Sequence, residues 1–281
     1  MDRRQLGATG VDVPEVGLGT WQYRGGVAPL QRGLDLGATL IDTAEIYGSE
    51  GIVGQAIRGR RDEVFLATKV SGQHLRHDQV IEAADASLKR LGVETIDLYQ
   101  VHWPDRHVPI GETMQAMERL VEAGKVRYIG VSNFSRREVE AAQAALPHSR
   151  IAANQVEYSL QRRDIEADIE FYREHQITVI AYSPLGLGEL LSNRKRADLD
   201  VLRRVAGEAG KTPAQVALNW LLSRPGVITI PKSDRAERVE ENCGASGWRL
   251  DREHIEQLEA AFPRQGGLRG LITGLEEGLS E

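Results

Sequence analysis

Four residues of types that can transfer protons stand at or just beyond the ends of three expected strands. Asp42 ends the apolar run 39–42, Lys69 ends the run 64–69, and His102 ends the run 96–102. Tyr47 follows Asp42 after a short loop. Each has an ordinary alternative: a helix cap for the aspartate, a charge reaching solvent for the lysine, a hydrogen-bonded core position for the histidine, and a place on a pocket rim for the tyrosine. No single one of them indicates a site.

Taken together, the four side chains fit the reduction of a carbonyl group by hydride transfer. The developing alkoxide needs a proton donor, and a free tyrosine with a pKa near ~10 is a poor acid at neutral pH. A lysine cation beside the phenol lowers that pKa, and an aspartate can hold and neutralise the lysine. A histidine can orient the carbonyl group and donate to its oxygen. This chemistry requires the ends of the three strands to converge on one point.

The order of apolar runs predicts an architecture that brings those ends together. The runs are nearly continuous rather than alternating, which is typical of strands buried on both faces of a parallel sheet. Eight of them are expected to be strands: 15–19, 39–42, 64–69, 96–102, 126–132, 152–156, 178–182 and 227–230. Helical periods separate the runs, without a linker rich in Pro, Gly or Ser. The fold class is therefore predicted as α/β, a (β/α)8 TIM barrel in which residues 1–281 form a single domain, with its chemistry at the carboxyl ends of the strands.

Local signals place several helices and the two ends of the chain. Apolar stripes predict helices over 78–91 and 112–123. Ser135 with Glu138 has the spacing of a capping box, and Thr212 followed by Pro213 predicts another helix start. Residues 1–14, with turn glycines, are expected to form a β-hairpin that closes the barrel floor. The glycine-rich tail 263–281 is expected to be loose or weakly helical.

Composition limits the partners and the compartment. Lys plus Arg is 35 and Asp plus Glu is 41, so the formal net charge of −6 offers no large basic field for nucleic acid. The single cysteine, Cys243, excludes a disulfide within the chain and fits a reducing compartment. No secretory signal follows Met1, and no apolar run approaches the ~20 residues needed to cross a bilayer. These features predict a cytoplasmic protein, monomeric by default, with no nucleic-acid, membrane or metal partner.

Four stretches resemble the aldo-keto reductase family. They are Leu-Ile-Asp-Thr-Ala-Glu-Ile-Tyr-Gly-Ser-Glu at 40–50 with Val-Gly at 53–54, Leu-Ala-Thr-Lys-Val at 66–70, and Asp-Leu-Tyr-Gln-Val-His-Trp-Pro at 97–104. The similarity runs from Gly-Leu-Gly-Thr-Trp at 17–21 to Arg-Leu at 249–250. It implies an NADPH-dependent oxidoreductase that reduces aldehydes and ketones, with Tyr47 as acid, Lys69 and Asp42 tuning it, and His102 orienting the carbonyl.

The expected coenzyme lacks its usual sequence fingerprint. No Gly-x-Gly-x-x-Gly follows a strand, but barrels of this class bind phosphate near the loops after their seventh and eighth strands. Lys232, Ser233 and Arg238 could meet a phosphate there, at the start of a helix. From the residues alone, an ordinary helix start with Ser233 as its cap is equally acceptable. The resemblance implies that these three hold the 2′-phosphate of NADP and that Asn242 contacts the adenine.

The resemblance also implies the remaining contacts of the coenzyme and the substrate. Ser132, Asn133 and Gln155 would hold the nicotinamide carboxamide, Tyr182 would stack beneath the ring, and Asp42 with Thr43 would reach the ribose. Further coenzyme contacts are expected from Thr20, Trp21, Ser183, Pro184 and Leu185. Trp21 and Trp103, together with Tyr47 and His102, would form the substrate pocket. Trp220 and Trp248 are expected to be structural.

Three loop segments are short. Segments 24–29, 105–111 and 185–198 carry no long insertion, which predicts an open pocket and a preference for small or planar aldehydes.

Two functions are alternatives to carbonyl reduction. One is that of a non-catalytic barrel subunit that senses the nicotinamide within a larger assembly. The other is a barrel aldolase using Lys69 as a Schiff base, which requires a desolvated lysine without an ion-pair partner. Asp42, Lys232 and Arg238 argue against the aldolase.

Overall fold

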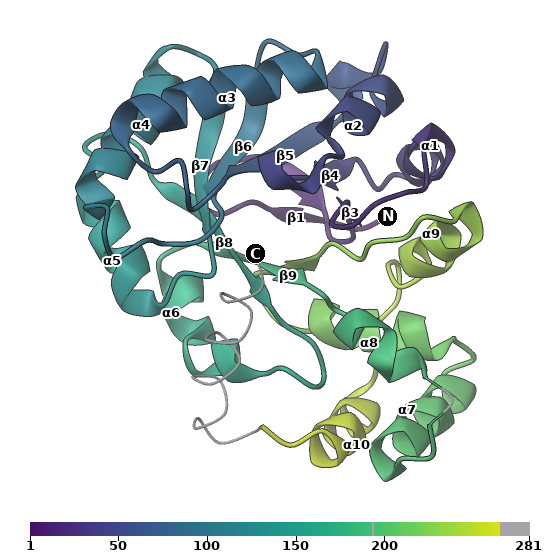
Figure 1. Ribbon diagram of the computed structural model, residues 1–281. Coiled ribbons are helices and arrows are strands. Elements are labelled where there is room, and N and C mark those ends of the chain that lie inside the picture. Colours follow the sequence, from purple (N-terminus) through teal and green to yellow (C-terminus); the bar gives the residue numbers. More distant parts are fainter. Residues whose placement is uncertain (193, 265–281) are drawn as a thin grey trace.

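A computed structural model describes residues 1–192 and 194–264 of the chain. Figure 1 shows a ring of strands surrounded by helices. One sheet has eight strands, all paired in parallel, in the order β10-β9-β8-β7-β6-β5-β4-β3. Its strands are β3 (Leu18–Gly19), β4 (Leu40–Asp42), β5 (Phe65–Val70), β6 (Ile96–Val101), β7 (Val126–Ser132), β8 (Ile151–Glu157), β9 (Thr178–Tyr182) and β10 (Val227–Thr229).

The two edge strands of this sheet meet, so the sheet closes into a barrel. Isolated parallel bridges join Val16 to Thr229 and Gly19 to Lys232. The amide of Gly17 donates to the carbonyl of Thr229 at 2.8 Å, and the amide of Thr229 donates to the carbonyl of Glu15 at 3.0 Å. The predicted (β/α)8 barrel is therefore confirmed. The first strand is shorter than the expected run 15–19, although that run still pairs with β10 through these bonds.

Helices cover the outside of the ring, as the alternation of runs predicts. They are α1 (Val27–Asp35), α2 (Glu50–Ala56), α3 (His77–Leu91), α4 (Ile110–Glu122), α5 (Arg136–Ala144), α6 (Ile169–Glu174), α7 (Ala197–Glu208), α8 (Pro213–Leu222), α9 (Ala236–Cys243) and α10 (Arg252–Ala261). Short 3-10 turns are η1 (Glu45–Tyr47), η2 (Arg61–Glu63), η3 (Asp164–Ala167) and η4 (Gly186–Leu191). Both predicted capping boxes are present, at Ser135 and at Thr212. Within the described residues, no helix combines the length and apolar character needed to span a bilayer.

The N-terminal hairpin closes the amino end of the barrel, as expected. Strands β1 (Arg3–Gln5) and β2 (Asp12–Pro14) pair in antiparallel fashion. The amide of Gly7 donates to the hydroxyl of Thr178, the first residue of β9, at 2.8 Å. Gly7 also has a φ of +51°, and a Cβ there would lie 2.5 Å from the carbonyl oxygen of Ala152, so both conformation and space favour glycine. The tail beyond residue 264, which was expected to be loose, lies outside the described residues.

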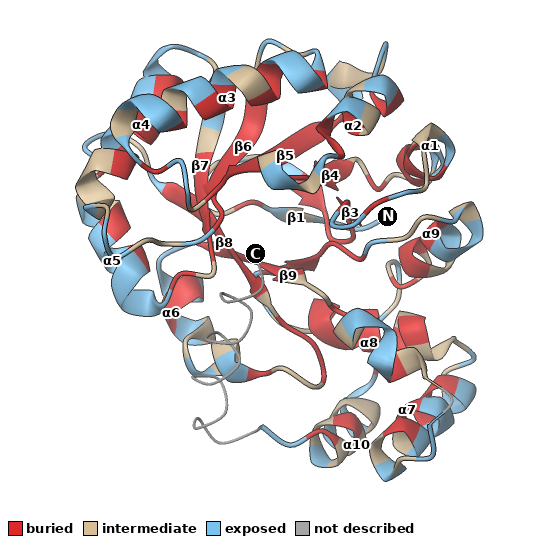
Figure 2. Ribbon diagram, in the orientation of Figure 1, coloured by how far each residue is buried: buried red, intermediate tan, exposed pale blue. Residues whose placement is uncertain are grey.

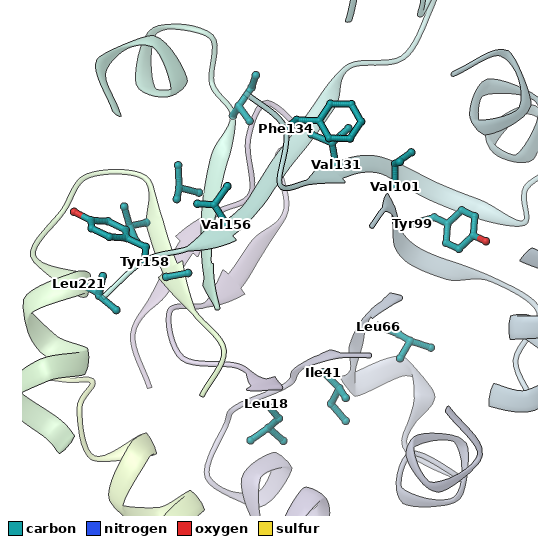
Figure 3. Close-up of a cluster of buried hydrophobic side chains, with 14 of the residues drawn as sticks. Leu18, Ile41, Leu66, Tyr99, Val101, Val131, Phe134, Val156, Tyr158 and Leu221 are labelled. Atoms are coloured by element: carbon teal, nitrogen blue, oxygen red, sulfur yellow. The ribbon is translucent and has the colours of Figure 1, made fainter. Parts of the chain in front are cut away.

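Two layers of apolar side chains hold the barrel together. Figure 2 shows the strands of the barrel sheet almost wholly buried and most helices with both buried and exposed residues, whereas α8 is buried over most of its length. The larger layer lies between the strands and the helices, and Figure 3 shows part of it distributed around the ring: Leu18, Ile41, Leu66, Tyr99, Val101, Val131, Phe134, Val156, Tyr158 and Leu221. The smaller layer fills the barrel interior, where Leu6 and Val13 of the hairpin region join residues of the strands. The interior is therefore a packed core below the carboxyl end, not a pore.

Candidate active site

Asp42, Lys69, Tyr47 and His102 come together at the carboxyl ends of β4, β5 and β6. The ammonium Nζ of Lys69 donates to Asp42 Oδ1 at 2.6 Å and to the carbonyl of Thr43 at 2.9 Å. It also lies 3.5 Å from the Tyr47 hydroxyl. The same hydroxyl lies 3.3 Å from His102 Nε2. The convergence of strand ends that the chemistry requires is present.

The second oxygen of Asp42 is held by two amides from the barrel interior. Gln155 Nε2 donates to Asp42 Oδ2 at 2.8 Å, and Gln100 Nε2 donates to it at 3.2 Å. All three side chains are buried. Asp42 therefore has charge-assisted bonds at both oxygens, and these bonds fix the position of the Lys69 ammonium.

The loop that carries Tyr47 is fastened at both ends. Tyr47 closes the turn η1, and Gly48 follows it with a φ of +68°, a left-handed conformation that glycine adopts without strain. At the start of η1, the Glu45 carboxylate accepts from the amide of Ser71 and lies 3.1 Å from His74 Nδ1. Ser71 comes two residues after Lys69 in the chain. The turn with the phenol is thus tied to the segment that follows the lysine strand.

Three hydroxyl groups form a buried chain beneath the same loop. Ser49 Oγ lies 2.9 Å from Thr43 Oγ1 and donates to Thr20 Oγ1 at 3.0 Å. Thr20 Oγ1 in turn donates to the carbonyl of Asp42 at 2.9 Å. These bonds join the ends of β3 and β4 to the start of α2. Thr20 and Thr43, both expected near the coenzyme, therefore have a structural role as well.

Burial controls the protonation of the candidate acid. Burial raises the pKa of the Tyr47 phenol, the Lys69 cation lowers it, and Asp42 raises it further, with a net upward shift. The expectation that Lys69 brings this pKa below its usual value is therefore wrong in its net direction. The lysine acts with the expected sign, but removal of water from the phenolate outweighs it. Tyr47 is consequently a neutral phenol at physiological pH.

Lys69 is charged at physiological pH, whereas His102 is neutral. Burial disfavours the Lys69 ammonium, but Asp42 and Tyr47 outweigh it, so the pKa of Lys69 is raised. Burial, with a smaller contribution from the Lys69 cation, lowers the pKa of His102 to about 3. Its buried Nδ1 has no hydrogen-bond partner within the described part of the chain. The site thus combines a cationic lysine, a neutral phenol and a neutral imidazole.

The candidate nicotinamide contacts lie on the next two strands. Ser132 ends β7, and its hydroxyl donates to the carbonyl of Gln155 on β8 at 2.9 Å. Asn133, with a φ of +61°, donates from Nδ2 to the carbonyl of His102 at 3.1 Å. The Tyr182 hydroxyl, at the end of β9, donates to Asn133 Oδ1 at 3.0 Å. A hydrogen-bonded polar wall therefore runs from the His102 strand to the end of β9.

The candidate phosphate contacts follow β10. Lys232 and Arg238 are exposed, Ser233 is half-buried and Asn242 is buried in α9. Helix α9 begins at Ala236 with Arg235 as its N-cap residue, so the alternative reading of Ser233 as the helix cap is wrong. Ser233 instead accepts at Oγ from the amide of Arg235 at 3.2 Å. Arg238 lies in the first turn of α9.

Large apolar side chains stand exposed around the carboxyl end of the barrel. Trp21 is 45% exposed and Trp103 is 47% exposed, following β3 and β6 respectively. Ser183, with a φ of +46°, leads into Pro184 and Leu185 and then into η4. Outside this rim, Trp220 is buried, with the guanidinium groups of Arg163 and Arg224 packed on its ring. Trp248 donates to the carbonyl of Gly244 at 3.0 Å. The last two tryptophans are structural, as predicted.

The sequence reasoning missed two polar residues of this site. Gln100 lies two positions before His102 on β6, so strand periodicity places both on the same face. That spacing could have identified it. Asp234 forms an ion pair with Lys232 at 2.5 Å. An aspartate two residues from a lysine in a loop gives no comparable sequence signal.

The barrel and its polar carboxyl end place this chain among the (β/α)8 proteins with their chemistry at the ends of the strands. Comparison with known proteins identifies the family within this fold class. The chain belongs to the aldo/keto reductase family, whose model matches residues 15–262.

Individual relatives cover nearly the whole chain. It is 36% identical to methylglyoxal reductase YeaE of Escherichia coli K12, over 93% of this chain and 95% of that protein. It is 35% identical to methylglyoxal reductase DkgB of Escherichia coli O157:H7, over 88% and 92% of the two chains. A crystal structure of an aldo-keto reductase from Klebsiella pneumoniae in complex with NADPH superposes with a TM-score of 0.86, at 36% identity, over 95% and 97% of the two chains.

Proposed function

We propose that this protein reduces small aldehydes and α-oxoaldehydes with NADPH, and that Tyr47 is the proton donor. Membership of the aldo/keto reductase family makes it an NADP-dependent oxidoreductase of carbonyl compounds. The observation that carries the residue assignment is the position of the Tyr47 hydroxyl, 3.5 Å from Lys69 Nζ and 3.3 Å from His102 Nε2. The non-catalytic alternative has no supporting feature in the described residues.

The proposed proton transfer follows from the charge states of these groups. When bound, NADPH supplies a hydride to the carbonyl carbon. As negative charge develops on the carbonyl oxygen, the neutral Tyr47 phenol gives up its proton to it. The phenolate that forms faces the Lys69 cation, which stabilises it, and Asp42 keeps that cation in place. Solvent then returns a proton to the phenolate.

His102 is proposed to orient the substrate rather than to carry charge. With its pKa lowered to about 3, the imidazole is neutral and can donate only from the nitrogen that bears the hydrogen. Nδ1 has no protein partner in the described residues, whereas Nε2 faces the Tyr47 hydroxyl. A hydrogen on Nε2 would let His102 and Tyr47 hold the same carbonyl oxygen. Each donor would then act where the negative charge develops.

The donor set along the barrel rim fits NADPH. Amide and hydroxyl groups on Ser132, Asn133 and Gln155 are suited to a carboxamide, and the Tyr182 ring lies at the adjacent strand end. At the far end, Lys232, Ser233 and Arg238 offer two cations and a hydroxyl for a phosphate, with Asn242 beyond them. We propose that the segment from Ser183 to Leu185 also contacts the coenzyme, as do Thr20 and Trp21.

Small carbonyl compounds are the proposed substrate class. Two relatives with at least 35% identity are named methylglyoxal reductases. In this chain the connection between β6 and α4 is short, and Trp21 and Trp103 stand exposed beside the site. An open rim of this kind holds a compact, planar dicarbonyl against aromatic surface but gives a bulky ligand few contacts. We therefore propose methylglyoxal and similar aldehydes as the preferred substrates.

An aldolase mechanism disagrees with the electrostatics of Lys69. Schiff-base formation needs a neutral amine, which enzymes obtain by lowering the lysine pKa. Here the Asp42 carboxylate at 2.6 Å and the Tyr47 phenol raise it. The same pair that excludes a nucleophilic amine supplies the cation that a phenolate needs.

We also propose that the protein is a single-domain monomer of the cytoplasm. The bonds between the Glu15–Gly19 run and β10 join the start and the end of the barrel into one unit. Cys243, the one cysteine of the sequence, is buried and unpaired. Size-exclusion chromatography with light scattering would test the monomer directly.

The proposal is tested by substituting Tyr47 with phenylalanine and following NADPH oxidation by methylglyoxal. The loss of one general acid predicts a fall in kcat of ~10²–10⁴-fold, whereas the Kd for NADPH should stay within about twofold because the ring remains. Tyr128→Phe is the matched control, since Tyr128 stacks on Phe65 away from the site and should leave kcat unchanged. A Tyr47→Phe enzyme with near-normal kcat would refute the acid assignment. A steroid ketone reduced with a higher kcat/KM than methylglyoxal would refute the substrate class.

A further inference from the structure

A carboxylate pairs with one of the candidate phosphate-binding cations. Asp234 Oδ2 lies 2.5 Å from Lys232 Nζ, and Asp234 Oδ1 accepts from the amide of Arg24 at 2.7 Å. Burial favours the neutral acid, but the Arg24 amide and the Lys232 cation lower the pKa of Asp234 below its usual value. The group is therefore ionised at physiological pH. One of the two cations expected to meet a 2′-phosphate already has an anionic partner.

The position of this carboxylate is fixed by the short segment after β3. The amide of Arg24 comes from that segment, and Gly25 packs directly on residue 234. A Cβ on Gly25 would lie 2.7 Å from the Asp234 carbonyl oxygen and 2.7 Å from the Tyr23 hydroxyl. The Tyr23 hydroxyl also donates to the carbonyl of Gly26 at 2.8 Å, which stiffens the turn. The Arg24 amide thus holds one oxygen of the Asp234 carboxylate while the other pairs with Lys232.

The second candidate cation is paired in the same way. Arg238 Nη1 lies 2.8 Å from Glu241 Oε2, one turn further along α9. The segment 232–241 contains three cations, Lys232, Arg235 and Arg238, and four carboxylates, Asp234, Glu237, Glu240 and Glu241. Glu240 pairs with Arg32 of α1, so within the segment three cations face the three remaining carboxylates. Any phosphate bound by Lys232 also experiences repulsion from the fixed Asp234 carboxylate.

We propose that Asp234 is a specificity-determining residue that weakens the preference for NADPH, so that the enzyme binds NADH as well. The 2′-phosphate is the only difference between the two coenzymes, and Asp234 faces the cation that would hold it. Its carboxylate lowers the benefit of the phosphate without affecting the rest of the coenzyme. This inference rests on the proposed role of Lys232 and Arg238, and it goes beyond the coenzyme assignment of the family.

The test measures binding of NADP⁺ and NAD⁺ to the full-length protein by isothermal titration calorimetry, without turnover. Asp234→Asn removes the charge while the amide oxygen can still accept from the Arg24 amide. It should tighten NADP⁺ by about tenfold at low ionic strength and leave NAD⁺ within about twofold, because only the phosphate meets the removed charge. The gain should shrink as salt is added. Asp234→Ser is a second route to the same charge change if the asparagine variant folds poorly.

A matched control and a companion variant separate the possible outcomes. Glu82→Gln removes one charge from the exposed face of α3 and should change neither affinity. Arg238→Ala should weaken NADP⁺ much more than NAD⁺. If Arg238→Ala does so but neither Asp234 variant alters the ratio of the two dissociation constants, the inference is overturned while the phosphate site stands. If Arg238→Ala is also silent, the phosphate site and the inference fail together.

Discussion

The surroundings of His102 determine the protonation state of its imidazole. A histidine in water has a pKa of about 6.5, in the middle of the physiological range. Here burial beside the Lys69 cation lowers the pKa to about 3. The folded protein therefore keeps this ring neutral over the whole range in which an exposed histidine would titrate. The hydrogen-bonding pattern presented to a substrate stays constant with pH.

This gives a prediction for the pH dependence of the reaction. Since His102 gains its proton only near pH 3 and the Tyr47 pKa is raised, kcat/KM for methylglyoxal should be flat between about pH 5 and 8. Methylglyoxal does not titrate in this range, and a limb caused by the 2′-phosphate of NADPH, whose second pKa is near ~6, would persist in a His102 variant. An acid limb with an apparent pKa near 6.5 that disappears in His102→Gln would contradict the neutral imidazole.

The same shift has a sign for stability. The pKa of His102 is lower folded than unfolded, so the unfolded chain binds a proton that the native protein does not. Above about pH 6.5 neither state binds this proton, so His102 does not lower the free energy of unfolding. As the pH falls from about 6.5 toward 3, only the unfolded chain binds the proton, and the free energy of unfolding decreases. Acid therefore destabilises the protein through this residue even though the site keeps its charge state.

Sequence alone identified the side chains that meet at the site, but not their electrostatics. The runs that end at Asp42, Lys69 and His102 are readable because strand ends of a barrel share one edge. The net pKa shift of Tyr47 was missed because it depends on how completely water is excluded, which no spacing records. The pairing of Lys232 with Asp234 was missed because it depends on a distant turn, in which the Arg24 amide donates to the carboxylate and Gly25 packs on the backbone of residue 234.

At the scale of single elements, α2 shows how one helix can hold the site through its packing. It begins three residues after Tyr47, and the buried Glu50 in its first turn accepts from Thr68 Oγ1 at 2.7 Å and from Arg90 Nε at 2.6 Å. Further along, Gly54 lies against the end of α3, where a Cβ would be 2.3 Å from the carbonyl oxygen of Leu91. The close contact brings α2 and α3 together behind the Tyr47 loop.

A pair of glycines in α2 gives the second prediction. Gly54→Ala should lower the free energy of unfolding by about 1–3 kcal/mol, because the new methyl group meets backbone that cannot shift cheaply. Gly51→Ala, in the same helix with open space around it, should instead raise it by up to about 1 kcal/mol through helix propensity. Urea denaturation of both variants measures the difference. Equal changes would show that the α2–α3 contact does not require glycine.

Element positions were largely predictable where local signals were strong. β7 and β9 begin and end at the expected residues, and the capping boxes at Ser135 and Thr212 begin α5 and α8. The alternative of Ser233 as a helix cap was acceptable because serine is a common cap residue, but α9 begins at Ala236 with Arg235 as its N-cap residue. The run 15–19 shortens to β3 because only part of it forms a continuous ladder with β4.

Across the whole molecule, a buried carboxylate joins segments from both ends of the chain. Glu15 is fully buried, and its oxygens accept from Arg4 at 3.2 Å, from Ser246 at 2.8 Å and from Arg249 at 2.6 Å. Arg4 belongs to the hairpin, whereas Ser246 and Arg249 follow α9. The network therefore ties the barrel floor to the last part of the barrel wall.

Removal of the Glu15 carboxylate should destabilise the protein. Glu15→Ala should lower the free energy of unfolding by about 1–3 kcal/mol, because Arg4 and Arg249 lose a shared buried partner. Arg249 is partly exposed and also pairs with Asp2, so the loss is smaller than for a fully buried ion pair. Asp85→Ala is the control, since Asp85 and Lys125 form an exposed pair worth less than about 1 kcal/mol. Urea denaturation midpoints and m-values give the free energy of unfolding of each variant. A Glu15→Ala variant no less stable than the control would show that the network contributes little.

The seam between the first and last strands has a consequence for biosynthesis. The 15–19 run pairs with β10 and the residues just after it, and the bonding groups at Thr229 and Pro231 leave the ribosome long after Gly17 and Gly19. Until then the nascent sheet has an open edge at β3, and the ring cannot close however well the intervening units have formed. Closing so long a loop costs entropy that is recovered only when both sides of the seam are present. The finished barrel therefore arises in a late, concerted step, and a ribosome stalled before β10 would present an open sheet edge to chaperones.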